Sequence, residues 1–211
     1  MSASSPLQRL ARQARQTSAA NLERCELCSA VIPTTHRHLL ALPAREVCCV
    51  CYPCSVLFDR EAASEGRFKL IPDRHLALPD FDLGDGEWQR LRVPVGMAFV
   101  LLDSSVDQPR AYYPSPMGAT QTLLEPEDWQ AVTDRNPILG SLRPDVEALL
   151  VNRLRGTRDH FLVPIDDCYR LVGIIRTTWR GLAGGAEVWT QVDAYFADLR
   201  ARSRTPKREA A

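Results

Sequence analysis

Six of the chain's seven cysteines fall within the 30 residues from Cys25 to Cys54. Cys25 and Cys28 form one Cys-x-x-Cys pair, and Cys51 and Cys54 form another at the end of the segment. Two closely spaced thiols direct both sulfurs at one ion, and a second pair completes a tetrahedron. Zn²⁺ accepts four thiolates in this geometry without redox chemistry. The spacing therefore predicts a zinc site, which is the strongest constraint on how this chain folds.

The choice of the second pair depends on the residues around it. Cys48 and Cys51 have the same spacing as Cys51 and Cys54, and Cys51 cannot serve in both pairs. Residues 55–63 combine apolar residues with good helix formers, so a helix should carry Cys54 in its first turn, where the helix dipole favours a thiolate. The sequence therefore favours Cys25, Cys28, Cys51 and Cys54 as the ligands.

Two short runs between the cysteine pairs, residues 37–42 and 46–50, have the composition of strands. The resulting order is a cysteine pair, a hairpin, a second cysteine pair and a helix, which resembles a treble-clef zinc finger. On the second strand Cys49 and Cys51 share a face, while Cys48 points to the other side.

Other ligand sets remain open at this point. Four thiols also hold iron or an iron–sulfur cluster, whereas disulfides would need an oxidising compartment. Cys48 and Cys49 are expected to behave as small buried hydrophobic residues, but they stay candidates for additional or alternative ligands. His36 and His38 lie on one face of the first strand and are candidates of the same kind.

The rest of the chain divides by composition and by the positions of glycine and proline. A module of about 40 residues has too small a core to fold without its metal. Residues 1–22 contain no acidic residue and have the composition of a transit peptide, although a frayed extension is the favoured interpretation. We expect an α+β fold with a flexible N-terminal extension (1–22), a treble-clef-like zinc module (23–65), a packed connector (66–87), a compact α+β domain ending in two helices (88–203) and a disordered basic tail (204–211).

Charge and hydropathy restrict the classes of partner. No run approaches the ~20 apolar residues that a membrane span requires, and no secretory signal is evident, so a cytoplasmic protein is expected. Formal net charge is zero, but residues 81–199 hold 11 basic and 17 acidic residues. An acidic main domain disfavours nucleic-acid binding and suits docking to a protein.

No familiar catalytic arrangement occurs outside the cysteine-rich segment. The chain has neither a Gly-x-Ser-x-Gly elbow nor a glycine-rich phosphate loop, so we expect a protein that is not an enzyme. Arginines and aspartates near the C-terminus, with one tryptophan, predict a partner-binding face, because Arg and Trp often anchor interfaces. An internal Arg–Asp network is the alternative. This candidate partner face comprises Arg153, Arg158, His160, Asp166, Asp167, Arg170, Arg176, Trp179 and Arg180.

Several stretches together resemble an uncharacterised bacterial family, a domain of unknown function associated with gene neighbourhoods of nickel–iron hydrogenases. They are residues 23–28 with 36–39, 113–116 with 118–120, 144–153, 162–166 with 168–173, and 178–182 with Gly184-Gly185. The resemblance implies cysteine at the positions of Cys49, Cys51 and Cys54 and a variable residue at Cys48. That pattern supports leaving Cys48 out of the site and keeps Cys49 open.

The resemblance implies a function without specifying its chemistry. Hydrogenase subunits or maturation factors would be the protein partners, and the chain would be a zinc-stabilised accessory or adaptor protein. A redox or metal-trafficking protein that binds iron through the same cysteines is the first alternative. A zinc-finger regulator that binds nucleic acid is the second.

Overall fold

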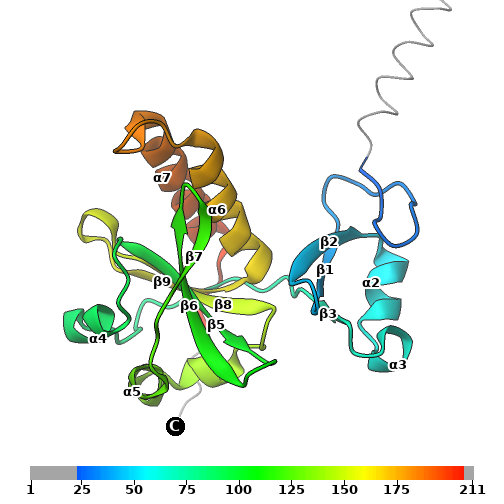
Figure 1. Cartoon of the computed structure of the whole chain (residues 1–211), viewed down its shortest axis with the longest axis horizontal. Coiled ribbons are helices and arrows are strands. Elements are labelled where there is room, and N and C mark those ends of the chain that lie inside the picture. The colour runs from blue at the N-terminus through cyan, green and yellow to red at the C-terminus, as the bar shows by residue number, and fades with distance from the viewer. Residues whose placement is uncertain (1–22, 207–211) are drawn as a thin grey trace, which may run out of the picture. The chain divides into compact units, whose positions relative to one another are not determined.

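The computed structural model describes residues 23–206 and divides the chain into two compact units, one ending at Leu70 and one beginning at Ile71. The fold class is α+β, as predicted: a four-cysteine unit is followed by an α+β unit that ends in two helices (Figure 1). The expected N-terminal extension, residues 1–22, and residues 207–211 of the expected tail lie outside the described residues.

The first unit is a three-stranded antiparallel sheet in the order β2-β1-β3, accompanied by two short helices. Its buried side chains include Leu39 and Leu40 on the central strand. The predicted hairpin and the helix that follows it are both confirmed, and their order is that of a zinc-finger-like module. The elements are β1 (Arg37–Ala41), β2 (Glu46–Val50), α2 (Tyr52–Phe58), α3 (Glu61–Ser64) and β3 (Phe68–Leu70).

The second unit is built on a six-stranded antiparallel sheet in the order β4-β9-β8-β5-β6-β7. All six residues of β8 are buried, because this strand is central and covered on both faces. Residues 147–152, whose apolar pattern suits either a strand or a helix, therefore form a strand. The strands are β4 (Leu76–Ala77), β5 (Met97–Asp103), β6 (Gln108–Ser115), β7 (Gly118–Thr122), β8 (Glu147–Asn152) and β9 (Asp159–Pro164).

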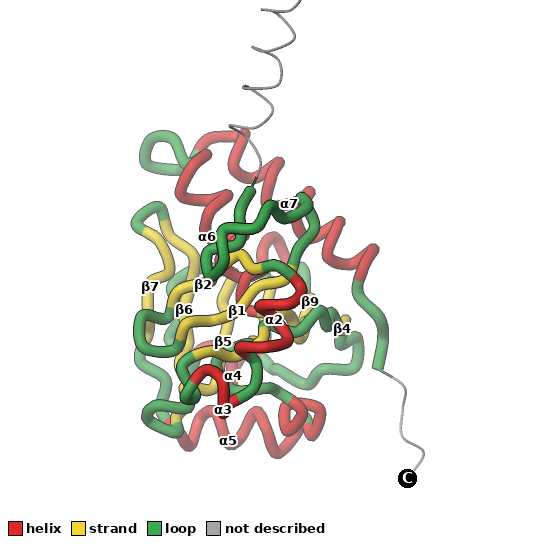
Figure 2. The backbone as a smooth tube through the Cα atoms, turned by 90° about the vertical axis from the view of Figure 1, so that its right-hand side faces the viewer, coloured by secondary structure: helices red, strands yellow, loops and turns green. Residues whose placement is uncertain are grey.

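Helices cover both faces of this sheet (Figures 1 and 2). Helix α6 contacts strands β6 to β9, and α7 packs on α6. On the opposite face, Val100, Leu149 and Leu162 pack with Trp129 and Val132 of α5. The helices are α4 (Asp85–Arg90), α5 (Pro126–Arg135), α6 (Ile165–Thr178) and α7 (Gly185–Arg202), with 3-10 turns at Pro137–Ser141 and Leu154–Gly156.

A buried ion pair holds the start of the second unit against its central strand. The Glu147 side chain is completely buried, and Arg74 donates to both of its carboxylate oxygens, at 2.7 and 2.5 Å. The Arg143 backbone amide adds a third hydrogen bond of 3.0 Å to the same carboxylate. A carboxylate can stay charged in such a site only when its oxygens are satisfied in this way.

Local backbone features complete the second unit. Helix α6 begins at Ile165, and the Asp166 carboxylate in its first turn accepts a hydrogen bond from the next amide. The turn between β6 and β7 is tight, because Gly118 adopts a positive φ of 120° and lets β7 pair directly with β6. The expected connector contributes a strand to each sheet, β3 and β4.

The C-terminal segment also differs from the expected tail. Helix α7 extends to Arg202, and Arg204 then pairs with Leu76 beside β4. The Arg204 amide donates to the carbonyl of His75, and the Arg204 carbonyl accepts from Ala77. These backbone hydrogen bonds tie Arg204, the first residue of that segment, to the sheet. No helix among residues 23–206 has the length and apolar character needed to cross a membrane.

Candidate metal centre

The first cysteine pair is shaped by a tight backbone turn. The Ser29 amide donates to the carbonyl of Cys25 at 2.8 Å, and the Cys25 amide donates to the carbonyl of Ala30 at 2.8 Å. Ser29 itself adopts a left-handed conformation with φ of 61°. This folding back of the chain brings Cys25 and Cys28, three residues apart, to one side of the turn.

The second pair is placed by the start of α2. Cys51 is the N-cap residue in an extended conformation, and its carbonyl accepts from the Ser55 amide at 2.9 Å. Cys54 lies one turn further along, with Pro53 at an early helical position where no backbone donor is needed. The helix start therefore presents both sulfurs of this pair to the same point.

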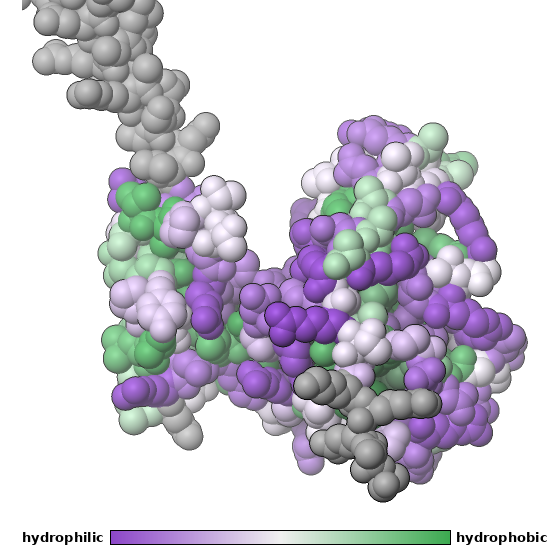
Figure 3. All heavy atoms as spheres, turned by 180° about the vertical axis from the view of Figure 1, so that it is seen from behind, coloured by the Kyte–Doolittle hydropathy of each residue, from purple (hydrophilic) through white to green (hydrophobic). Residues whose placement is uncertain are grey.

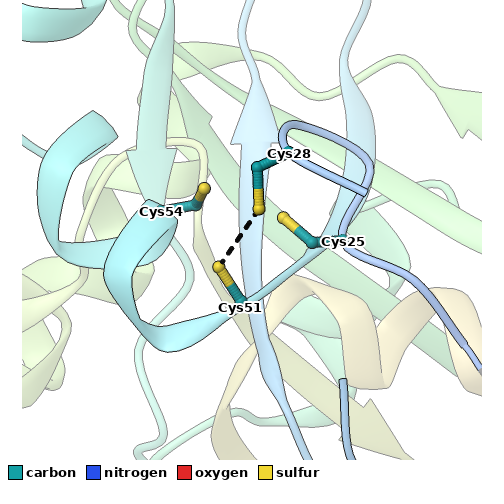
Figure 4. Close-up of side chains that lie close together, drawn as sticks. All are labelled: Cys25, Cys28, Cys51 and Cys54. Carbon is teal, nitrogen blue, oxygen red and sulfur yellow. Dashed lines mark hydrogen bonds between the residues drawn. The ribbon is translucent and has the colours of Figure 1, made fainter. Parts of the chain in front are cut away.

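The four sulfur atoms of Cys25, Cys28, Cys51 and Cys54 lie within 4.8 Å of one another, and all four point inward (Figure 4). The Sγ atoms of Cys28 and Cys51 are 3.6 Å apart. A tetrahedral zinc ion with Zn–S bonds of about 2.3 Å separates its sulfurs by about 3.8 Å. The donor set and its spacing thus fit one metal ion, and these are the four cysteines that the sequence favours.

The thiols of this cluster have very different environments. Burial would raise the pKa of Cys25, but hydrogen bonding to the backbone of Cys51, Cys28 and Leu27 outweighs it and lowers the pKa to about 6. Burial raises the pKa of Cys54 far above its usual value. A bound cation stabilises all four groups as thiolates and removes this conflict.

The remaining candidate ligands do not join this cluster. Burial and the Glu26 carboxylate raise the pKa values of Cys48 and Cys49, so either thiol would need a bound cation to become a thiolate. Cys49 lies instead with His36 and His38 in a separate group whose ligand atoms are within 4.8 Å of one another. Cys48 belongs to neither group.

Comparison with known proteins places the chain in a family. The family described as Family of unknown function (DUF5947) matches residues 24–203. The chain belongs to the DUF5947 family. No curated protein and no solved structure matches the chain. The family assignment covers both units of this DUF5947 protein and leaves its biochemical role to be inferred from the residues themselves.

The residues of the candidate partner face do not form one surface in the DUF5947 protein, because they lie in separate parts of the second unit. Arg153 and Arg158 both pair with Asp85 at the start of α4, at 2.7 and 3.0 Å. The Arg153 side chain is only 8% exposed and lies over the ring of Trp88. This arginine therefore ties α4 to the end of β8, while the Arg158 side chain stays exposed.

His160 and the residues of α6 lie on opposite faces of the sheet. His160 is buried and stacks on Phe81, which packs in the hydrophobic cluster around α5. The neighbouring Phe161 points the other way and stacks on Phe196 of α7. Because α6 and α7 cover that second face, the sheet separates His160 from Asp166, Asp167 and Arg170.

At the start of α6, Asp167 is the centre of a buried network. Its two oxygens contact Nε2 of His75 at 2.5 Å and Nη2 of Arg202 at 2.6 Å. Burial would raise the pKa of Asp167, but these hydrogen bonds lower it. Asp167 is among the residues of the candidate partner face, but His75 and Arg202 were not identified from the sequence as its partners. The sequence could have indicated a buried network here through the position of Asp167. It lies four residues before the buried Leu171, and hence on the inward side of the helix, where a carboxylate needs a partner.

The end of α6 is more open. Trp179 is half-buried, donates its indole N–H to the carbonyl of Gly181 at 2.9 Å and meets Trp189 edge-on. Arg180 donates to the carbonyls of Thr177 and Trp179. Arg176 is exposed on the last turn of α6. Exposed members of the candidate partner face are thus found at this end of the helix.

The ligand assignment can be tested by single substitutions. Changing Cys25, Cys28, Cys51 or Cys54 to Ser should remove the tightly held ion, because a three-thiolate site binds it far more weakly. Cys48→Ser is the matched control, since Cys48 lies on the same hairpin outside the cluster. Metal content is measured after dialysis against a weak chelator. Equal loss in Cys48→Ser and Cys51→Ser would contradict the assignment.

The buried histidine predicts a pH effect on stability. Burial, reinforced by the Arg153 charge, lowers the pKa of His160 from 6.5 to about 4. The unfolded chain takes up the proton near pH 6.5 and the folded chain does not, so stability is complete above this pH and falls as the pH drops towards 4. The loss reaches about 2 kcal/mol at pH 5.

Urea unfolding followed by tryptophan fluorescence measures this loss in the second unit, which contains all four tryptophans. The difference in unfolding free energy between pH 7.5 and pH 5 should shrink by about 2 kcal/mol in His160→Gln. His38→Gln, in the other unit, should leave it unchanged. An identical pH dependence in wild type and His160→Gln would show that His160 is not the group responsible.

Proposed function

We propose that this DUF5947 protein is a non-enzymatic, zinc-stabilised accessory or adaptor protein that serves the assembly or function of a nickel–iron hydrogenase. The main support for a structural metal ion is that four cysteine sulfurs lie within 4.8 Å of one another. Four thiolates fill a tetrahedron and leave no position for water, so such a site holds the chain together and does not activate a substrate.

The core of the first unit is built around this site. Its buried cluster contains the ligands Cys25 and Cys54 themselves, together with Ile32, Leu39 and Val50. Besides these two ligands, the cluster has three buried aliphatic side chains, against which partly buried residues such as Phe58 and Phe68 pack. A unit of this size has too little apolar burial to fold independently, which makes metal binding a part of its folding energy.

Zinc is the favoured ion, and iron defines the competing function. Four thiolates with iron would make the chain a redox or metal-trafficking protein. The two readings differ in colour, because zinc–thiolate sites are colourless and iron–thiolate sites are not. Elemental analysis of the purified chain distinguishes them directly.

The proposed partner is a protein, and we assign only its class. The family resemblance to proteins of hydrogenase gene neighbourhoods supports hydrogenase subunits or maturation factors. The acidic character of residues 81–199, which carry a net charge of −6, supports a protein partner. On the face shown in Figure 3, the surface formed by residues 71–206 is mostly hydrophilic, with a few hydrophobic patches. A nucleic-acid regulator would require a basic surface.

We place the docking face at the end of α6. Arg176 and Arg180 are exposed there beside the half-buried Trp179, and Arg and Trp are the residue types that most often anchor interfaces. Arg153 is excluded as an anchor because its side chain is buried against Asp85 and Trp88.

Metal removal should unfold one unit and spare the other. Amide exchange should show loss of protection in residues 23–70 after chelation, because the ion is part of their core. The tryptophan-monitored urea transition of the second unit should stay unchanged. If residues 23–70 remain equally protected without metal, the structural role of the site is wrong.

Affinity purification of the full chain from its native host tests the partner. Hydrogenase subunits or maturation factors should co-purify, and Arg176→Ala should lower their recovery about tenfold, as expected for an anchor worth about 1.4 kcal/mol. Its unfolding free energy should stay within about 0.5 kcal/mol of wild type.

Arg60→Ala, an exposed arginine in the first unit, is the matched control and should leave recovery unchanged. Unchanged recovery with Arg176→Ala would reject the docking face. Absence of any hydrogenase-related protein from the purified material would reject the partner class.

A further inference from the structure

The β1–β2 hairpin, with the residue just before it, carries a second group of metal-ligating side chains that shares no residue with the four-cysteine site. His36, His38 and Cys49 each offer one ligand atom, and these atoms lie within 4.8 Å of one another. We propose that these three residues form a second metal site, which binds a divalent transition-metal ion through two imidazoles and one thiolate.

The hairpin register explains why these residues meet. His38 of β1 lies directly opposite Cys49 of β2. Residues directly opposite each other in an antiparallel pair project from the same face, and the ring of His36, one residue before β1, meets the ring of His38 edge-on. Cys48 pairs with Leu39 and therefore projects from the other face. Strand pairing thus places His38 opposite Cys49, while His36 lies one residue before β1 and contacts the Pro33 carbonyl through Nδ1.

The separation of the two imidazoles matches that of metal ligands. Their Nε2 atoms are 3.2 Å apart, and the rings meet edge-on with centroids 4.8 Å apart. Two nitrogens at about 2.0–2.1 Å from a tetrahedral ion are separated by about 3.3 Å. An ion can therefore replace the proton that the two rings share, with little movement of either ring.

The surroundings of His36 select the nitrogen that faces the site. Its Nδ1 lies 2.9 Å from the carbonyl oxygen of Pro33. A carbonyl only accepts, so Nδ1 carries the hydrogen and Nε2 presents its lone pair to the site. The Glu23 carboxylate lies 3.3 Å from the same Nδ1. Metal-bound histidines commonly have such a carboxylate or carbonyl behind them, where it orients the ring and raises its basicity.

The ligand set indicates the class of ion. Imidazole and thiolate ligands together suit Zn²⁺ and the neighbouring ions Co²⁺ and Ni²⁺, whereas Mg²⁺ and Ca²⁺ require oxygen ligands. Binding releases one proton from the Cys49 thiol, and the Nε2 hydrogen of His38 moves to Nδ1. Three protein ligands leave one coordination position for water or an incoming ligand. The second ion is therefore exchangeable, unlike the ion in the four-cysteine site.

Cobalt titration of the untagged full chain tests this site. The chain is first loaded with one zinc ion, which occupies the tighter four-cysteine site, and Co²⁺ is then added. Wild type should bind one further ion per chain, with a thiolate-to-cobalt charge-transfer band from a single thiolate. His38→Gln and Cys49→Ser should retain the zinc and lose the cobalt, and Cys48→Ser should keep both.

Glu23→Gln is the finer variant, because it removes the charge behind His36 without removing a ligand. Its cobalt affinity should fall about 10- to 100-fold at unchanged stoichiometry. Retained zinc shows that each variant still folds. Binding of only one ion by wild type would overturn the proposal, as would equal cobalt binding by wild type and His38→Gln. Failure of the hydrogenase partnership would leave these results unaffected.

Discussion

The first unit depends on a single electrostatic requirement. Four sulfurs within 4.8 Å of one another cannot all be thiolates without a cation, because each charge raises the pKa values of the others. Two of the sulfurs, those of Cys25 and Cys54, are also buried in the core. A cation bound to all four would connect the turn at Cys28 to the start of α2 at Cys51, so we expect metal binding and folding of this unit to be one process.

The second unit is stabilised differently. Its central strand β8 is buried on both faces, and helices cover the sheet on either side. Its buried charges are matched within the unit: Arg74 with Glu147, and His75 and Arg202 with Asp167. Because these pairs replace the water that each charge loses, the unit is expected to fold without an ion. On the proposed role of the site, the first unit would depend on a metal ion for its fold and the second would not.

The β1–β2 hairpin links the two groups of metal ligands. Cys49 belongs to one group and Cys51, two residues later, to the other. The strand ends at Val50, and Cys51 already serves as the N-cap of α2, so the two thiols are directed to different centres. A closed site that holds the module and an open site on the same hairpin would give the protein both a structural and an exchangeable ion.

The sequence by itself determined the fold class, the hairpin, the helix after it and the four-cysteine cluster. These features are local: a Cys-x-x-Cys spacing constrains two sulfurs whatever the rest of the chain does, and strand and helix patterns repeat over a few residues. Tertiary structure decided what depends on distant pairing. Strand register placed Cys49 opposite His38, and these two form a group with His36. Packing on both faces of the sheet placed His160 away from Asp167 and brought His75 and Arg202 to that aspartate, contacts that no local pattern encodes.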